Sequence, residues 1–372
     1  MTPACRAELL DTAKNVAAGF ALRAAEADAQ GELPTEDIAE LKASGLLALS
    51  VPQAYGGLGA SLREIVEVQL ELAKGSASTG LVAAMTLHIA GREAELKQWP
   101  EHIREQILPD VARGALLNSA ASEPRLGSPS RGGLPDSTAE VDGDGYVIRG
   151  HKNWVTGGPH LKHLLVRVRL GDEARVFHVP ADTPLLRWEK TWGQGLSLRA
   201  SESHDVYFEG VRVANESLLP KTESPPLIWF PMMMAANYLG AGLAARDEVI
   251  RYCLERVPTA LGKPIATLPK IQRQIGELDV ALESARTFLL NSAGRWTGQG
   301  HAGFLPHAAS AKHVAVETAL NVTDKALRIA GAAGIDRGLN LERYLRDARG
   351  GLMHPPSGDA GLELIGRAAL GL

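Results

Sequence analysis

The chain has 372 residues, 45% of them hydrophobic and 22% charged, which is typical of a soluble globular protein with a substantial core. Its net charge of −4, with acids and bases mixed throughout, excludes the basic surface of a nucleic-acid-binding protein. The two cysteines cannot build a disulfide framework, and no apolar run reaches the roughly 18 residues that a membrane span needs. We therefore expect a cytoplasmic protein with neither a nucleic-acid nor a membrane partner.

The first 115 residues have the apolar spacing of amphipathic helices. Gly45 follows one helical segment in the position of a C-cap, and Ser61 precedes another in the position of an N-cap. Residues 1–115 are predicted to form an N-terminal helical domain, with helices at 4–30, 38–44, 62–76, 80–96 and 101–113.

From residue 116 the spacing of apolar residues changes toward every second residue. Gly, Ser, Thr, Val and Trp become frequent where the preceding sequence is rich in Ala, Leu, Glu and Arg. Short runs of this kind between turn residues are typical of strands. The pattern predicts a middle β domain, a barrel or sandwich, over 116–220, with strands at 116–122, 138–143, 145–157, 163–170, 174–180, 185–191 and 203–213.

The helical period returns after the middle segment and lasts nearly to the end of the chain. Four long helices joined by short connections are typical of an antiparallel bundle. Residues 221–372 are predicted to form a C-terminal four-helix bundle, with helices at 233–256, 268–296, 307–330 and 359–370. The expected fold class is mainly α with a β domain.

Five segments, each on the expected type of element and in the expected order, resemble motifs of the acyl-CoA dehydrogenase superfamily. VPQAYGGLGAS is similar to P-x-x-Y-G-G-x-G, SEPRLGS to T-E-P-x-x-G-S, and WVTG to W-I-T. RIAGAAG resembles Q-x-x-G-G-x-G, and LERYLRDAR resembles P-x-E-R-x-x-R-D-A. The resemblance spans nearly the whole chain and implies an acyl-CoA dehydrogenase-like fold that binds a flavin.

The resemblance assigns flavin-binding roles to the middle segment. It implies that Ser122 lies beside the isoalloxazine edge, that Trp154 forms an apolar wall, and that Thr156 lies near the reactive N5/O4 edge. Gly127 and Ser128 are suited to cradle a phosphate, because glycine lets the backbone approach and a hydroxyl can bond the phosphate oxygens. The alternative is purely structural, with Trp154 in the β core and Ser122 in a turn.

A second nucleotide-binding segment follows a long helix. Gly331, Ala332 and Gly334 either cap that helix or, as the resemblance implies, offer backbone amides to the flavin nucleotide of a neighbouring subunit. The second role implies a homodimer or homotetramer. Ala332 replaces a family glycine, and the family's arginine site near Arg256 has different spacing and lacks its phenylalanine. FAD is the expected cofactor. These departures leave FMN as the alternative, because FMN has no adenylate for the protein to bind.

The catalytic base of the dehydrogenases has no counterpart at the expected positions. The family's usual glutamate falls at Pro355, and a second base position used by some members falls near Phe230, so neither can accept a proton. Asp359 and Glu363 are spaced i, i+4 on the last helix, which is the pattern of a solvated face.

Two histidines suggest a different reaction. His354 stands where the flavin monooxygenases similar to dibenzothiophene monooxygenase carry a histidine, and His88 falls where that branch has another. In those enzymes reduced flavin meets O₂, and a histidine assists formation of the C4a-hydroperoxide. The alternative for His88 is a core histidine with satisfied hydrogen bonds.

Three functions remain open from the sequence. A monooxygenase-like enzyme, supplied with reduced flavin by a flavin reductase, is slightly favoured. The others are an acyl-CoA dehydrogenase with a non-standard base and a catalytically silent flavin-binding protein. The expected substrate is a small apolar molecule or an acyl thioester.

Overall fold

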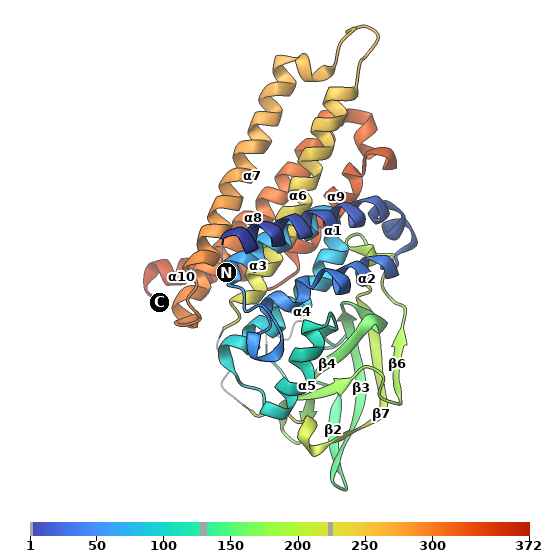
Figure 1. The fold of residues 1–372 in the computed structure, drawn as a ribbon, viewed down its shortest axis with the longest axis vertical. Helices are drawn as coiled ribbons and strands as arrows, with labels where there is room; N and C mark the ends of the chain where they lie inside the picture. Colours follow the sequence, from blue (N-terminus) through green and yellow to red (C-terminus); the bar gives the residue numbers. More distant parts are fainter. Residues whose placement is uncertain (1–2, 127–131, 222–225) are drawn as a thin grey trace.

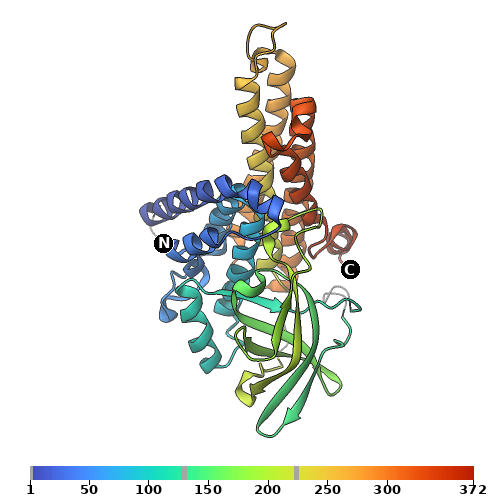
Figure 2. The same cartoon turned by 90° about the vertical axis from the view of Figure 1, so that its right-hand side faces the viewer.

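The computed structural model describes residues 3–126, 132–221 and 226–372, so Gly127 and Ser128 lie outside the described residues. The molecule is elongated, with the C-terminal helices and the β-sheet at opposite ends and the N-terminal helices between them (Figures 1 and 2). Within the described ranges, no helix is long and apolar enough to cross a membrane.

All five helices predicted for the N-terminal part are confirmed. Gly45 ends the second with a left-handed φ of 69°, and a capping box between Ser61 and Glu64 starts the third. The helices are α1 (Pro3–Gln30), α2 (Thr35–Ser44), α3 (Leu62–Gly75), α4 (Ala77–Leu96) and α5 (Glu101–Ala112).

The seven predicted strands are also confirmed, and they form one curled sheet (Figure 2). The strand order is β1-β4-β2-β3-β7-β6, with β5 paired to β4, and β1 runs parallel to β4. The strands are β1 (Leu116–Ala120), β2 (Thr138–Asp142), β3 (Gly145–Val155), β4 (Leu161–Leu170), β5 (Glu173–Pro180), β6 (Leu186–Glu189) and β7 (His204–Ala214).

The C-terminal part is helical as predicted, and it contains one helix that the sequence pattern did not indicate. The additional helix, α9, packs against α6 and α8, whereas α10 packs against α8. The helices are α6 (Trp229–Glu255), α7 (Pro269–Arg295), α8 (His301–Ala330), α9 (Leu341–Ala348) and α10 (Gly358–Leu370).

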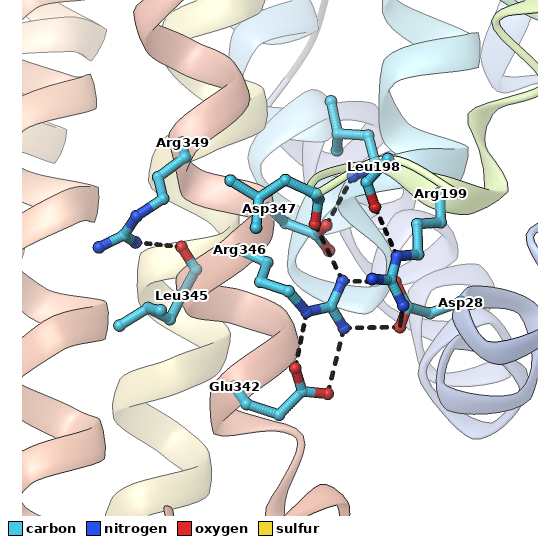
Figure 3. Close-up of polar contacts among 10 residues, drawn as sticks. Asp28, Leu198, Arg199, Glu342, Leu345, Arg346, Asp347 and Arg349 are labelled. Atoms are coloured by element: carbon cyan, nitrogen blue, oxygen red, sulfur yellow. Dashed lines mark hydrogen bonds and ion pairs between the residues drawn. The ribbon is translucent and has the colours of Figure 1, made fainter. Parts of the chain in front are cut away.

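Helix α9 forms polar contacts with both the N-terminal helices and the β domain (Figure 3). Arg346 binds the Asp28 carboxylate of α1 through two hydrogen bonds of 3.0 and 2.6 Å, and it also donates to the Leu196 carbonyl. The Asp347 carboxylate accepts the Leu198 N–H at 2.8 Å. The LERYLRDAR segment is therefore the junction between the N-terminal helices, the β domain and the bundle.

Candidate functional site

Trp154 lies on an irregular part of β3. The pairing of β3 with β7 shifts register between Lys152 and Val155, and Trp154 has a left-handed φ of 57°. Its side chain is 58% exposed, so the interpretation of Trp154 as a core residue is wrong. The neighbouring Asn153 N–H donates to the Ser122 carbonyl at 3.1 Å, which places Ser122 beside this bulge.

Thr156 is buried and fixed from two sides. Its hydroxyl shares a 2.9 Å hydrogen bond with the Ser203 hydroxyl, and its carbonyl accepts from the Asn118 side-chain amide at 2.9 Å. These contacts hold the chain rigidly just after Trp154.

The glutamate of the SEP segment anchors the loop that carries Ser122. The buried Glu123 carboxylate pairs with Lys152 and accepts the backbone N–H groups of Asp136 and Ser137 at 2.6 and 3.1 Å. Burial by itself would raise the pKa of Glu123, but these donors outweigh burial and lower it. Glu123 therefore stays ionised and secures the loop to the sheet.

The two predicted histidines come together across one aromatic ring. His88 on α4 contacts the edge of Phe230 at a centroid distance of 5.1 Å, and His354 lies 5.9 Å from the same ring. The buried Nδ1 of His88 has no hydrogen-bond partner among the described residues, unlike a satisfied core histidine. Phe230, near the predicted second base position, thus contacts both imidazoles.

A tyrosine and the protein interior set the state of these imidazoles. The hydroxyl of Tyr238, which is fully buried, lies 2.7 Å from His354 Nδ1, and burial raises its pKa well above 10. Burial, with a smaller effect from Lys312, lowers the pKa of His354 to about 4, although the Gly350 carbonyl acts in the opposite direction. Burial followed by the charge of Arg92 lowers the pKa of His88 to about 3. Both histidines are therefore neutral near pH 7.

The loop that carries His354 is held by a buried ammonium group. Lys312 on α8 is 3% exposed, and its Nζ donates to the carbonyls of Gly351, His354 and Pro356 at 2.9, 2.6 and 2.9 Å. Burial lowers the pKa of Lys312 to about 8. Three carbonyl oxygens thus take the place of a carboxylate partner.

Two adjacent residues of β1 connect the histidines to the Trp154 segment. The Thr86 hydroxyl of α4, two residues before His88, bonds both the N–H and the carbonyl of Leu117 at 3.0 and 3.1 Å. The next residue, Asn118, holds the Thr156 carbonyl. The two groups of residues therefore share one rigid connection.

The predicted nucleotide turn lies elsewhere in the chain. Gly331 caps α8, and the short helix η8 (Gly331–Ile335) follows at the end of α8 that points away from the β-sheet (Figure 1). Ala332 and Gly334 belong to this turn, and a Cβ at Gly334 would lie 2.6 Å from the Leu327 carbonyl oxygen. One subunit does not bring this turn to the Trp154 segment, and its role toward a neighbouring subunit stays a prediction.

The residues that sequence reasoning missed carried weak signals. Tyr238 lies eight residues after Phe230, about two helical turns along the same helix. Lys312 occupies the apolar stripe of α8 between Ala308 and Ala315, and a lone charge in such a stripe indicates a buried polar contact. Asn118 and Ser203 act only through tertiary contacts, which no sequence pattern encodes.

The described residues fit a flat aromatic cofactor. Trp154 exposes a large aromatic side chain from a rigid and strained backbone, and the buried Oδ1 of Asn153 beside it has no hydrogen-bond partner among the described residues. An exposed aromatic face next to an unsatisfied polar atom is what a heteroaromatic ring would cover.

Three family models match consecutive parts of the chain. They are described as the acyl-CoA dehydrogenase N-terminal domain, middle domain and C-terminal domain, and they match residues 5–115, 118–211 and 229–355. A putative acyl-CoA dehydrogenase of Bacillus subtilis, YdbM, is 35% identical over 355 residues, covering 93% of this chain and 92% of that protein.

Solved structures share the fold. Butyryl-CoA dehydrogenase from Megasphaera elsdenii has a TM-score of 0.88 at 23% identity and covers 100% of this chain and 99% of its own. TdsC from Paenibacillus sp. A11-2, in a complex with FMN and indole, has a TM-score of 0.87 at 23% identity, covering 98% and 97%. The chain therefore belongs to the acyl-CoA dehydrogenase family, and it is a flavin-dependent oxidoreductase.

Proposed function

We propose that this enzyme is a monooxygenase-like flavoenzyme in which His354 donates a hydrogen bond instead of abstracting a proton. The observation that carries the proposal is the contact between the Tyr238 hydroxyl and His354 Nδ1. A group that activates or stabilises reduced oxygen has to donate a hydrogen bond, whereas the base of a dehydrogenase has to accept a proton.

The contact assigns the tautomer of His354. Tyr238 is fully buried, and His354 Nδ1 is its one hydrogen-bond partner among the described residues. If Nδ1 carried a proton, the tyrosine hydrogen would be left without an acceptor in the interior, at a cost of about 1–3 kcal/mol. The hydroxyl therefore donates to Nδ1, and the neutral imidazole carries its proton on Nε2.

Three features disfavour His354 as a base. The Nδ1 lone pair accepts from a tyrosine whose pKa is well above 10, and Nε2 is already protonated. A new imidazolium would also form close to the buried Lys312 ammonium, which already lowers the His354 pKa. The residue at the family glutamate position is Pro355, and none of the hydrogen bonds of His354, Tyr238 or Lys312 within the described ranges involves a carboxylate.

The cofactor of this proposal is FAD, with FMN as the alternative. A bound reduced flavin supplies two electrons to O₂, and a flavin reductase would replenish them. Trp154 would flank the ring, and the Thr156 segment would present its backbone to the ring edge. Gly331, Ala332 and Gly334 would reach the nucleotide of a neighbouring subunit in a homodimer or homotetramer, with Gly127 and Ser128 at the phosphate.

The second candidate is an acyl-CoA dehydrogenase with a non-standard base. The 35% identity to a putative acyl-CoA dehydrogenase favours it, and its substrate would be an acyl thioester. The monooxygenase-like reaction would instead act on a small apolar molecule. A silent flavin-binding protein would bind the flavin and perform neither reaction.

The test uses flavin-loaded enzyme, reduced without oxygen by dithionite and then mixed with O₂ in a stopped-flow spectrophotometer. The proposal predicts reoxidation through a transient absorbing species in the wild type, which His354→Ala shortens about tenfold while releasing hydrogen peroxide sooner. His313→Ala, on α8, is the matched control and should behave as the wild type. Identical reoxidation in all three proteins would reject the donor role of His354.

A further inference from the structure

Three polar side chains form a stripe along the second half of α4. His88, Arg92 and Glu95 are spaced i, i+4 and i+7, so they share one face of the helix. His88 is 9% exposed, Arg92 and Glu95 are half-buried, and the stripe ends beside the exposed Lys97. The stripe therefore runs from the histidine cluster toward the surface.

The guanidinium in the middle of this stripe has no hydrogen-bond or ion-pair partner among the described residues. Arg92 forms no hydrogen bond or ion pair with the described part of the chain, and its Nε is buried. Burial lowers the pKa of Arg92, although the charge of Glu93 acts in the opposite direction. Such a group costs stability unless an anion compensates it.

The nearby carboxylates are already engaged. Glu93 accepts the backbone N–H groups of Gln98 and Trp99 at 3.1 and 3.0 Å, where it closes the end of α4. Glu95 accepts the Trp296 indole N–H at 2.8 Å. Within the described part of the chain neither acid forms an ion pair with Arg92, and the charge of Glu93 offsets only part of the effect of burial.

The unsatisfied atoms lie around one region. Among the described residues, His88 Nδ1, Arg92 Nε and one oxygen of Glu95 are buried without a hydrogen-bond partner, as is the indole nitrogen of Trp229 at the start of α6, which lies near Glu95 and acts to lower its pKa. Buried polar atoms are rarely left unpaired, and a cluster of them on facing helices points to a polar ligand.

We propose that Arg92 binds an oxyanion of the substrate, one helical turn from His88. The site would take a carboxylate of the substrate itself or a phosphate of its thioester carrier, through the fork of donors that arginine offers to such groups. This inference rests on the proposed function, because it takes the histidine cluster to be the place of reaction. It refines the substrate class from an apolar molecule to one with an anionic end.

Calorimetric titration of the flavin-loaded enzyme tests the proposal without turnover. Benzoate and benzamide are nearly isosteric and differ in charge, and free CoA supplies phosphates without an acyl group. We expect the wild type to bind benzoate or CoA, and Arg92→Gln to weaken that binding roughly tenfold or more, as expected for loss of a charge-assisted pair. Benzamide should bind the two proteins equally.

Two further variants keep the result interpretable. Lys97→Gln removes a nearby exposed charge and should change benzoate and CoA affinity less than about twofold. Arg92→Lys should restore part of the lost affinity, provided that flavin occupancy and the melting temperature match those of the wild type. Dependence on Arg92 in the benzoate titration identifies a substrate carboxylate, and dependence in the CoA titration alone identifies a carrier phosphate.

Equal benzoate and CoA affinities in the wild type and Arg92→Gln would overturn the oxyanion site. That result would leave the proposed function standing, because the oxygen reaction of the reduced enzyme does not require this ligand. Conversely, oxyanion binding that depends on Arg92 in an enzyme without the oxygen reaction would reject the proposed function alone.

Discussion

Trp154 combines a strained backbone with an exposed side chain. A left-handed φ in a bulky residue costs of order 1–3 kcal/mol, and the exposed ring recovers little of it by burial in the described chain. Strain of this kind persists where function requires it. The bulge at Trp154 is therefore best explained by the ring that we expect the side chain to flank.

Replacing this tryptophan should separate folding from cofactor binding. Trp154→Gly should raise the unfolding free energy of the flavin-free protein by about 1 kcal/mol, because glycine adopts a positive φ without strain. The same variant should lose flavin affinity, measured by equilibrium dialysis. Trp154→Phe, which keeps an aromatic wall, is the control, and normal flavin affinity in Trp154→Gly would contradict the assigned wall.

Asp110 on α5 gives the molecule a definable sensitivity to acid. Burial alone would raise its pKa, but hydrogen bonds from Lys162, Arg113 and His163 lower it to about 2. Because the folded pKa lies below the unfolded value of 3.8, the ionised carboxylate stabilises the fold above about pH 4, and this contribution is lost as pH falls toward 2.

The corresponding variant is Asp110→Asn. It should lower the unfolding free energy by about 2 kcal/mol at pH 7, the equivalent of this pKa shift, and by progressively less below pH 4. Urea titrations at several pH values measure the difference. Asp144→Asn, in an exposed turn, should show no such pH dependence, and a constant effect of Asp110→Asn across this range would refute the assignment.

At the scale of elements, the long helices and the strands were predictable because their apolar residues repeat with the period of the element. Helix α9 was not, because it has only eight residues and buries the charged Arg343 and Asp347, so that charge does not mark its exposed face. Tertiary contacts, not local periodicity, hold this helix in place. Its sequence could be matched to a family motif but not to a helix.

The candidate site was predictable to a similar degree. His88 and His354 were identified by their positions in motifs, and the structure places both against Phe230. Tyr238 and Lys312 escaped prediction, because their roles depend on contacts with a loop that lies over a hundred and about forty residues away, respectively. The roles of Gly127 and Ser128 stay predictions, since both lie outside the described residues.

The loop from Gly351 to Pro356 depends on one side chain of another element. Lys312→Met should release this loop, because three buried carbonyl groups lose a charged donor. We expect amide hydrogen exchange in residues 349–357 to accelerate by about tenfold or more, while the flavin stays bound. Lys325→Met, on the same helix and half-exposed, is the control. Unchanged exchange in the loop would show that Lys312 does not hold it.

At the scale of the whole molecule, the Arg346 network joins units that are far apart in sequence (Figure 3). Both side chains of the Arg346–Asp28 pair are 11% exposed, so removing Arg346 leaves the buried Asp28 carboxylate, among the described residues, with only the longer, 3.9 Å pair to Arg199. This junction ties α1 and the segment at Leu198 to α9, the helix that precedes the loop carrying His354.

Breaking this junction should destabilise the whole chain. Arg346→Met is expected to lower the unfolding free energy by about 3 kcal/mol or more, as for the loss of one partner of a buried pair. Arg328→Met, which removes an exposed pair with Asp324, should change it by less than about 1 kcal/mol. Denaturant titration followed by circular dichroism gives both values. Equal changes in unfolding free energy for the two variants would show that the Arg346 network stabilises the fold no more than an exposed ion pair does.

We propose that His354 acts as a donor in oxygen chemistry and that the described residues of the site include no base for acyl-CoA oxidation. The most direct measurement is anaerobic titration of the oxidised, flavin-loaded enzyme with a series of saturated acyl-CoAs, followed by the flavin absorbance near 450 nm, where roughly full bleaching accompanies two-electron reduction. We expect the absorbance to persist with every acyl-CoA. Bleaching by any of them would contradict it.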